Sequence, residues 1–186
     1  MVLGGTGAIG SHLVNTLAVE GGVNCFVISR KIRQNERRVN YVQGSAHDPD
    51  FVRHLLHDTK YDAIVDFMSY STEEFKSRYW LYLDSTEQYI YLSSSRVYAE
   101  SKGEIIEDSP RLLDVCKDED YLATDEYTLK KTHQEDVLRE SGYLNWTIIR
   151  PYITYSEEWL LLSPLEKECW LIVQFMGERF ILQGFG

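Results

Sequence analysis

The sequence has few cysteines and no paired ones. Its 186 residues include only Cys25, Cys116 and Cys169, which are widely spaced and form no Cys-x-x-Cys pair. An odd number of scattered cysteines disfavours both a disulfide framework and a zinc knuckle. We therefore predict a reduced protein of the cytoplasm.

Long apolar runs are also missing. No run of about 18 apolar residues is present, and the first residues lack the basic segment and apolar core of a secretory signal. His54 and His57 lie three positions apart without a third ligand nearby, so a solvated helix face explains them better than a metal site. We expect neither a membrane partner nor a bound metal.

Positive charge is in deficit, because 19 lysines and arginines face 29 aspartates and glutamates, which gives a net charge of −10. Such a chain repels a nucleic-acid backbone unless its basic residues gather on one face. The densest basic run is a single loop, which contains Arg30, Lys31, Arg33, Arg37 and Arg38. We therefore disfavour nucleic acid as a partner.

Strand and helix signals alternate along the chain. We expect strands at residues 1–3, 23–29, 39–43, 61–67, 88–92 and 146–149. Helices are expected at residues 8–18, at 49–57, through the 70s and early 80s, and at 125–141. This alternation predicts an α/β fold, a Rossmann-like doubly wound parallel sheet with helices on both faces. Residues 99–123 are expected to form a long polar loop of the kind that covers a site.

A glycine-rich segment joins the first expected strand to the first helix, and its glycines are spaced Gly-x-x-Gly-x-x-Gly. Gly4 allows a tight turn, Gly7 lets a pyrophosphate approach the backbone, and Gly10 lets the helix pack closely on the sheet. A glycine turn without a ligand is the alternative. We predict a dinucleotide site whose phosphates meet Gly4, Thr6, Gly7, Ala8, Ile9 and Gly10.

The end of the second strand bears on which cofactor binds. An acidic residue about 20 positions after the last glycine binds the ribose 2′-hydroxyl of NAD. This chain has Ser29-Arg30-Lys31 there instead, and an arginine can bind a 2′-phosphate with its fork of donors. We therefore expect Ser29 and Arg30 to contact the cofactor and NADP to be preferred over NAD. A solvated basic loop is the competing interpretation.

Further polar residues fall where a parallel sheet brings strand ends together. Ser94 closely follows the strand at 88–92, and Tyr127 and Lys131 lie four positions apart, on one helix face. A Tyr-x-x-x-Lys pair alone is uninformative, but after a glycine turn and a serine-tipped strand it predicts catalysis. Tyr127 would exchange a proton with a substrate hydroxyl or carbonyl, and Ser94 would bind the same oxygen. Lys131 would favour the ionised tyrosine and hold the cofactor ribose.

These segments together resemble the extended short-chain dehydrogenase/reductases, in particular the NAD-dependent epimerase/dehydratases. The resemblance covers residues 1 to about 155 and rests on the glycine segment, Ser93 to Tyr98, Tyr127 to Lys131 with Glu135, and Arg150-Pro151-Tyr152. It implies an NAD(P)-dependent epimerase, dehydratase or reductase that acts by hydride transfer on a small molecule such as a nucleotide-sugar. It also implies further cofactor contacts from the strand ends, namely Phe67, Met68, Ser93, Pro151, Tyr152 and Ile153.

The resemblance also implies the organisation of the chain. We expect an NAD(P)-binding Rossmann domain at residues 1–155 and the start of an incomplete C-terminal substrate-binding region at 156–186. Because the first strand begins almost at residue 1, we expect the sequence to be a piece of a longer protein. Members of this family commonly pair through helices, so a homodimer is also considered.

Three departures from the family pattern leave an alternative open. Gly44-Ser45 stands where the family has Gly-Asp, and Tyr155-Ser156-Glu157 stands where it has Tyr-Gly-Pro. The run Asp66-Phe67-Met68-Ser69 replaces a commoner run of small residues. Similar features occur in atypical members, including a chloroplast branch that binds RNA. The alternative is therefore a non-catalytic member that keeps the dinucleotide as a structural or sensing module and associates with RNA.

Overall fold

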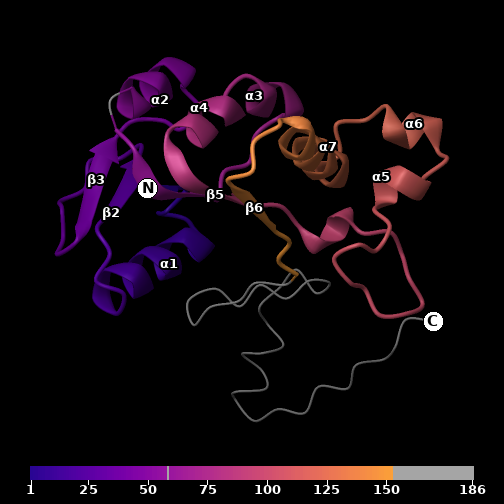
Figure 1. Ribbon diagram of the computed structural model, residues 1–186, viewed down its shortest axis with the longest axis horizontal. Helices are drawn as coiled ribbons and strands as arrows, with labels where there is room; N and C mark the ends of the chain where they lie inside the picture. The colour runs from indigo at the N-terminus through magenta and orange to yellow at the C-terminus, as the bar shows by residue number, and fades with distance from the viewer. Residues whose placement is uncertain (58, 153–186) are drawn as a thin grey trace, which may run out of the picture. The chain divides into compact units, whose positions relative to one another are not determined.

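The computed structural model describes residues 1–57 and 59–152 of the chain (Figure 1). These residues form a six-stranded sheet in the order β3-β2-β1-β4-β5-β6, and every neighbouring pair of strands is parallel. The strands are β1 (Val2–Leu3), β2 (Cys25–Ser29), β3 (Val39–Gln43), β4 (Tyr61–Asp66), β5 (Thr86–Leu92) and β6 (Trp146–Ile149).

Helices cover both faces of this sheet. In Figure 1, α1 lies on one side of the sheet, and α2, α3, α4 and α7 lie on the other. The helices are α1 (Ala8–Val19), α2 (Pro49–Leu56), α3 (Thr72–Lys76), α4 (Tyr79–Asp84), the 3-10 helix η1 (Ser95–Val97), α5 (Leu112–Val115), α6 (Glu119–Leu122) and α7 (Tyr127–Glu140). The predicted doubly wound α/β fold is therefore confirmed. None of the described helices is long and apolar enough to cross a membrane.

The start of α2 shows how a local signal fixes an element. Asp48 is the N-cap, and its carboxylate accepts hydrogen bonds from the backbone N–H groups of Asp50 at 3.0 Å and Phe51 at 3.1 Å. Pro49 occupies the first helical position, where its missing N–H costs no hydrogen bond. The expected helix at 49–57 therefore forms as predicted, with its last helical residue at Leu56.

The single helix expected through the 70s and early 80s is wrong, because the structure has two short helices there. Ser71 and Glu74 begin α3 with a reciprocal capping box. The backbone then leaves the helical conformation at Arg78, where φ is −138°. The buried Arg78 guanidinium donates to the Ala46 carbonyl oxygen at 2.8 Å, and this contact holds the chain at the break between α3 and α4.

The long loop expected at residues 99–123 also needs correction, because it contains α5 and α6. Each of these helices has four residues, which is little more than one turn, so no apolar periodicity reveals it. Local caps hold them instead. The Asp118 carboxylate accepts from the Tyr121 N–H at 3.0 Å at the start of α6, and Arg111 and Asp114 form a reciprocal pair at the start of α5.

The two faces of the sheet have different cores. On the face covered by α4 and α7, the core is rich in buried tyrosine. Tyr82 and Tyr89 stack with ring centroids 5.5 Å apart, and Phe75 lies 5.1 Å from Tyr91. These rings pack α3 and α4 onto β5. On the face covered by α1 the core is aliphatic, with Val2, Val14, Ala18, Val27 and Val39.

The connections between strands change direction between β1 and β4. From β1 the chain continues through β2 to β3 on one side, and from β4 it continues through β5 to β6 on the other. The two strands are joined at Leu3 and Asp66, and the Phe67 N–H donates to the Leu3 carbonyl oxygen at 3.0 Å. In open parallel sheets, ligands bind in the crevice outside the carboxyl ends of the strands at such a point.

Replacing Gly10 by alanine tests the close packing of α1 on the glycine turn. A Cβ at Gly10 would overlap the Gly4 carbonyl oxygen and lie 2.7 Å from the Gly5 Cα. Both contacts are with backbone atoms, so Gly10→Ala should lower the free energy of unfolding by about 1–3 kcal/mol in urea titrations. In the control Gly103→Ala, the new Cβ meets only the Ser101 Oγ at 3.9 Å. That control should change stability by less than about 0.5 kcal/mol, and equal losses in both variants would contradict the packing role.

Candidate functional site

The glycine turn leaves the first turn of α1 without a side-chain cap. Gly4 has φ +73°, and its carbonyl oxygen accepts from the Gly7 N–H at 3.0 Å, so the chain reverses tightly after β1. Gly7 is the N-cap of α1, and no side chain bonds to the helix start and no acidic residue lies in its first turn. The leading N–H groups and the positive end of the helix dipole are thus available to an anion.

The glycines of this turn differ in what surrounds them. A Cβ on Gly7 would meet only the Gly4 carbonyl oxygen, at 3.3 Å, and Thr6, Gly7 and Ala8 are exposed. The outer side of the turn is therefore open at the point where a phosphate would approach. Gly5 is different, because its Cβ would lie 2.9 Å from the Val27 Cγ1 in the core. Gly5 therefore packs against the core, whereas the predicted phosphate contacts Thr6, Gly7 and Ala8 lie on the open side of the turn.

The strand ends bring the other predicted cofactor residues to the same edge of the sheet. Phe67 and Met68 follow β4, next to the glycine turn, since a Cβ on Gly4 would lie 3.1 Å from the Phe67 Cβ. Ser93 follows β5, and its N–H donates to the Ile149 carbonyl oxygen of β6 at 2.8 Å. Pro151 follows β6, and its carbonyl oxygen accepts from the Ser95 N–H at 2.9 Å.

The two adjacent serines at the end of β5 have different surroundings. The Ser94 hydroxyl caps η1 by accepting from the Arg96 N–H at 3.2 Å, and the side chain is buried. Ser93 is only 2% exposed, and its Oγ has no hydrogen-bond partner among the described residues. A buried hydroxyl without a partner costs free energy unless a ligand or water bonds to it. Ser93 therefore fits a site that is completed by a polar ligand.

Tyr127 and Lys131 lie one turn apart at the start of α7. Tyr127 is the first helical residue and is 37% exposed, with the Arg96 guanidinium carbon 5.7 Å from its ring centroid. Lys131 is only 5% exposed, and its ammonium donates to the Leu92 carbonyl oxygen at 2.7 Å. No hydrogen bond joins Tyr127, Lys131 and Ser94 to one another in the part of the chain that the structure describes. Two N–H groups of Lys131 therefore remain for a ligand.

Burial governs the charge of Lys131. Removal from water lowers the pKa of its ammonium to about 8, and the nearby carboxylates of Asp66 and Glu135 oppose that decrease. Below this pKa the group is positively charged. Lys131 is therefore a cation near neutral pH that loses its charge at only slightly higher pH.

Glu135 ties the end of β6 to α7. It is fully buried, and Arg150 binds it with two hydrogen bonds, from Nε to Oε1 at 2.9 Å and from Nη2 to Oε2 at 2.6 Å. The Arg111 Nη1 lies 3.9 Å from the same carboxylate and also binds Asp136 at 2.5 Å. The Arg150 guanidinium stacks on Tyr98, 4.6 Å from its ring centroid. This cluster holds the segment after η1 beside the helix that carries Tyr127.

No sequence pattern indicates the role of Arg111, because its partner Asp136 is 25 positions away. Glu135 belongs to the motif, four residues after Lys131. No sequence pattern, however, pairs it with Arg150 and Arg111. Only a known fold could have suggested that the loop before α5 reaches α7.

The remaining predicted residues lie nearer the rim. At the end of β2 the Ser29 hydroxyl donates to the Lys31 carbonyl oxygen at 2.9 Å, and Arg30 is exposed, with no side-chain hydrogen bond or ion pair within residues 1–57 and 59–152. Tyr152 is 83% exposed. Ile153 and the predicted C-terminal region at 156–186 lie outside the described residues.

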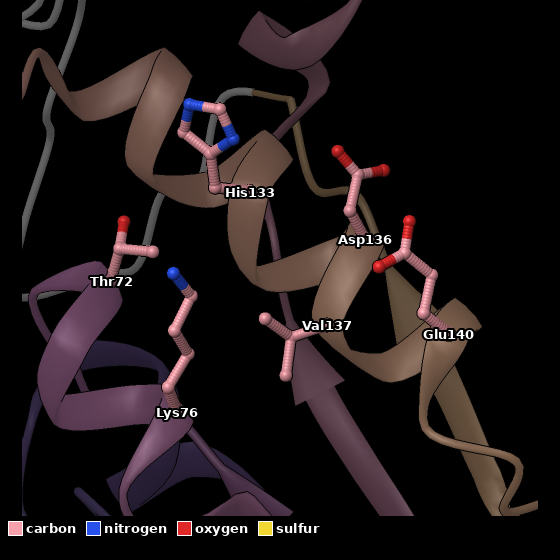
Figure 2. A pocket seen from close by; sticks show the side chains of 6 residues that line it. All are labelled: Thr72, Lys76, His133, Asp136, Val137 and Glu140. Carbon is pink, nitrogen blue, oxygen red and sulfur yellow. The ribbon is translucent and has the colours of Figure 1, made fainter.

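A separate hollow lies between α3 and α7 (Figure 2), and none of its lining residues belongs to the predicted site. It has a volume of about 450 Å³. Figure 2 shows Lys76 from α3 and the two acidic side chains from α7 on different parts of its rim. The lining residues are Thr72, Lys76, His133, Asp136, Val137 and Glu140.

The order of the parallel strands, the glycine turn and the open helix start together define a dinucleotide-binding Rossmann domain. The sequence model of the NAD(P)H-binding family matches residues 4–158, and the chain belongs to this family. The orphaned Ser93 hydroxyl and the space beside Gly7 fit such a cofactor.

A curated relative offers a second comparison. The chain is 28% identical over 181 residues to the chloroplast stem-loop binding protein of 41 kDa b of Arabidopsis thaliana. The match covers 90% of this chain and 44% of the relative. The chain thus spans less than half the length of that protein.

Solved structures share the fold. The enzyme WbmH of Bordetella bronchiseptica in complex with NAD+ is 18% identical with a TM-score of 0.69, over 96% of this chain and 62% of that one. The dTDP-glucose 4,6-dehydratase of Bacillus anthracis in complex with NAD is 15% identical with a TM-score of 0.67, over 98% and 63%. The UDP-glucuronic acid 4-epimerase of Bacillus cereus with NAD is 17% identical with a TM-score of 0.62, over 83% and 56%. The expected resemblance to epimerase/dehydratases is therefore confirmed for the fold.

Replacing Arg150 tests the buried cluster around Glu135. In Arg150→Met the carboxylate loses its bidentate partner and keeps only Arg111, at 3.9 Å. We expect the free energy of unfolding to fall by about 3 kcal/mol, as for other buried pairs that lose one partner. Arg53→Met is the control, because Arg53 forms an exposed pair with Asp50 and its loss should cost less than about 1 kcal/mol. Similar losses in the two variants would show that Glu135 does not depend on Arg150.

Proposed function

We propose that this chain is the nucleotide-binding part of an NAD(P)-dependent oxidoreductase of the epimerase/dehydratase type, with Ser94, Tyr127 and Lys131 as its catalytic residues. The observation that carries this proposal is the buried ammonium of Lys131 one turn after the exposed Tyr127, at the edge of the sheet where the glycine turn ends. Family membership and the fold of NAD-bound epimerases and dehydratases support it. A nucleotide-sugar is the proposed substrate class.

Each edge of the cofactor would meet a different part of this site. The N–H groups of the glycine turn would hold the pyrophosphate. The residues after β4 would line the ribose, and Ser93 and the residues after β6 would hold the nicotinamide end. When bound, the cofactor supplies the hydride acceptor or donor. The proposed contacts are Gly4, Thr6, Gly7, Ala8, Ile9, Gly10, Ser29, Arg30, Phe67, Met68, Ser93, Tyr127, Lys131, Pro151, Tyr152 and Ile153.

The protein's own share of the reaction is proton transfer. The Tyr127 hydroxyl would give a proton to a substrate carbonyl or take one from a substrate hydroxyl. The nearby Lys131 ammonium stabilises the phenolate that remains. The Ser94 hydroxyl, which already accepts from the Arg96 N–H, still has its own hydrogen to donate to the same substrate oxygen.

Removing the Tyr127 hydroxyl tests the proposed function. Tyr127→Phe should bind NADPH within about twofold of the unchanged protein, as followed by nicotinamide fluorescence, and should lose turnover by about 10²–10⁴-fold. Turnover is assayed with UDP-glucuronic acid and dTDP-glucose, which the names of the fold relatives specify. Tyr143→Phe is the control, because Tyr143 lies beyond the end of α7 and bonds to Asp84 at 2.7 Å. Full turnover in Tyr127→Phe would remove the catalytic assignment.

Cofactor preference tests the end of β2. We propose that the exposed Arg30 binds the 2′-phosphate of NADP, since no side-chain partner within the described residues holds it elsewhere. Arg30→Ala should then weaken NADPH binding by about tenfold and leave NADH binding nearly unchanged. Arg53→Ala removes an exposed arginine from α2 and serves as the control. Equal loss for both cofactors, or no loss, would reject this contact.

RNA binding is a second candidate, and the curated stem-loop binding relative favours it. The Arg30 to Arg38 loop is the basic segment that could meet a phosphate backbone. Against it stands the net charge of −10, which repels nucleic acid at long range. Fluorescence anisotropy with an RNA hairpin at physiological salt measures RNA binding directly. It separates the two functions, because RNA binding, unlike the proposed turnover, does not require the Tyr127 hydroxyl.

A further inference from the structure

Asp66 is a buried carboxylate to which the proposed reaction assigns no role. It ends β4 and is fully buried. Its oxygens accept hydrogen bonds from the Met68 N–H at 2.8 Å and from the Tyr89 hydroxyl at 2.8 Å. No ion pair engages Asp66 anywhere in residues 1–57 and 59–152. A buried charge without a paired cation is costly and calls for a reason.

Strand register and the position of α7 bring Asp66, Tyr91 and Lys131 to the same face of the sheet. Asp66 and Tyr91 are direct partners in the parallel pairing of β4 and β5, so their side chains point to the same face of the sheet. That face is covered by α7, because the Tyr91 hydroxyl donates to the Gln134 side chain. The Lys131 ammonium lies 4.7 Å from the centroid of the Tyr91 ring.

The groups around this pair make Asp66 distinct from the other nearby carboxylate. Glu135, on the same helix as Lys131, is already bound by two arginines. Asp66 is held only by uncharged donors, so its negative charge is not balanced by a partner of its own. The titratable and charged groups that face Asp66 and Lys131 are Tyr70, Tyr82, Tyr89, Tyr91, Tyr127 and Glu135, with Arg78 stacked on Tyr70.

Burial acts on both charges in opposite directions. It raises the pKa of Asp66 to about 6, against the hydrogen bonds from Met68 and Tyr89 and the charge of Lys131. It lowers the pKa of Lys131 to about 8. Both groups are therefore charged between about pH 6 and 8. Burial also raises the pKa of Tyr89 well above its ordinary value, so this phenol stays a neutral donor in that range.

We infer that Asp66 is a positioning residue, whose carboxylate keeps the Lys131 ammonium charged and in place over the Tyr91 ring. The effect of Asp66 on Lys131 is independent of the proposed function, whereas its consequence for turnover rests on that function. An opposite charge favours the charged form of an amine, so loss of the Asp66 charge should make Lys131 easier to deprotonate.

The direct test is a pH titration of the chain carrying ¹³Cε-labelled lysine, followed by NMR. The Lys131 signal is assigned by its disappearance in Lys131→Arg. In Asp66→Asn the pKa of Lys131 should fall by about one pH unit or more. Asp62→Asn is the matched control, because it makes the same change at an exposed position of the same strand and should leave Lys131 unchanged. An unchanged Lys131 titration in folded Asp66→Asn would overturn the inference.

A measurement without a change at Asp66 guards against a variant that does not fold. With Asp66 in place, the Lys131 signal should show a second, smaller inflection near pH 6 as Asp66 ionises. This curve is recorded in the variant His133→Gln, because imidazoles titrate in the same range and His133 lies two residues after Lys131 on α7. A Lys131 curve with a single inflection in that background would also overturn the inference.

The pH dependence of kcat/KM separates this inference from the proposed function. If both hold, the alkaline limb of the profile moves to lower pH in Asp66→Asn, by about the same amount as the pKa of Lys131. If Asp66 had only a structural role, Asp66→Asn would lower kcat/KM at every pH, and the alkaline limb of the profile would stay at the same pH. A shifted Lys131 titration with an unmoved limb would support the effect of Asp66 on Lys131 and reject Lys131 as part of the catalytic machinery.

Discussion

The pairing of β1 with β4 is the contact on which the site depends. β1 has only two residues, yet it pairs with β2 on one side and with β4 on the other. Gly4 follows Leu3 directly, so this pairing sets the glycine turn beside the strand end that carries Asp66. The uncapped start of α1 and the buried charges beneath α7 thereby share one edge of the sheet, although they are far apart in the sequence.

The two buried carboxylates at this edge are satisfied in different ways. Glu135 is bound by arginines and fixes the position of the chain after β6 relative to α7. Asp66 accepts hydrogen bonds from neutral donors and keeps its net charge. Lys131 interacts with both charges without being closed into an ion pair by either. A buried cation held in this manner keeps N–H groups free for a ligand, which a tight ion pair would occupy.

Local signals explain which parts the sequence predicted. The Asp48-Pro49 start of α2 and the glycines before α1 act within a few residues, so the sequence alone reveals them. Contacts between distant segments explain the rest. Lys131 bonds to the Leu92 carbonyl oxygen across 39 positions, and the Tyr89 hydroxyl reaches Asp66 across 23. Such contacts depend on strand register and on where α7 crosses the sheet, and neither can be read from a single sequence.

The tyrosine-rich core beneath the site also constrains how the family can vary. Four of its buried phenols take part in three hydrogen bonds with other buried polar groups, namely Tyr70 with Tyr82, Tyr89 with Asp66 and Tyr91 with Gln134. A phenylalanine in one of these positions would leave the partner's polar atom unsatisfied in a dry interior. Hydrogen bonding as well as side-chain volume therefore determines which residue fits each of these positions. In related chains, a change at one of these tyrosines should be accompanied by a change at its hydrogen-bond partner.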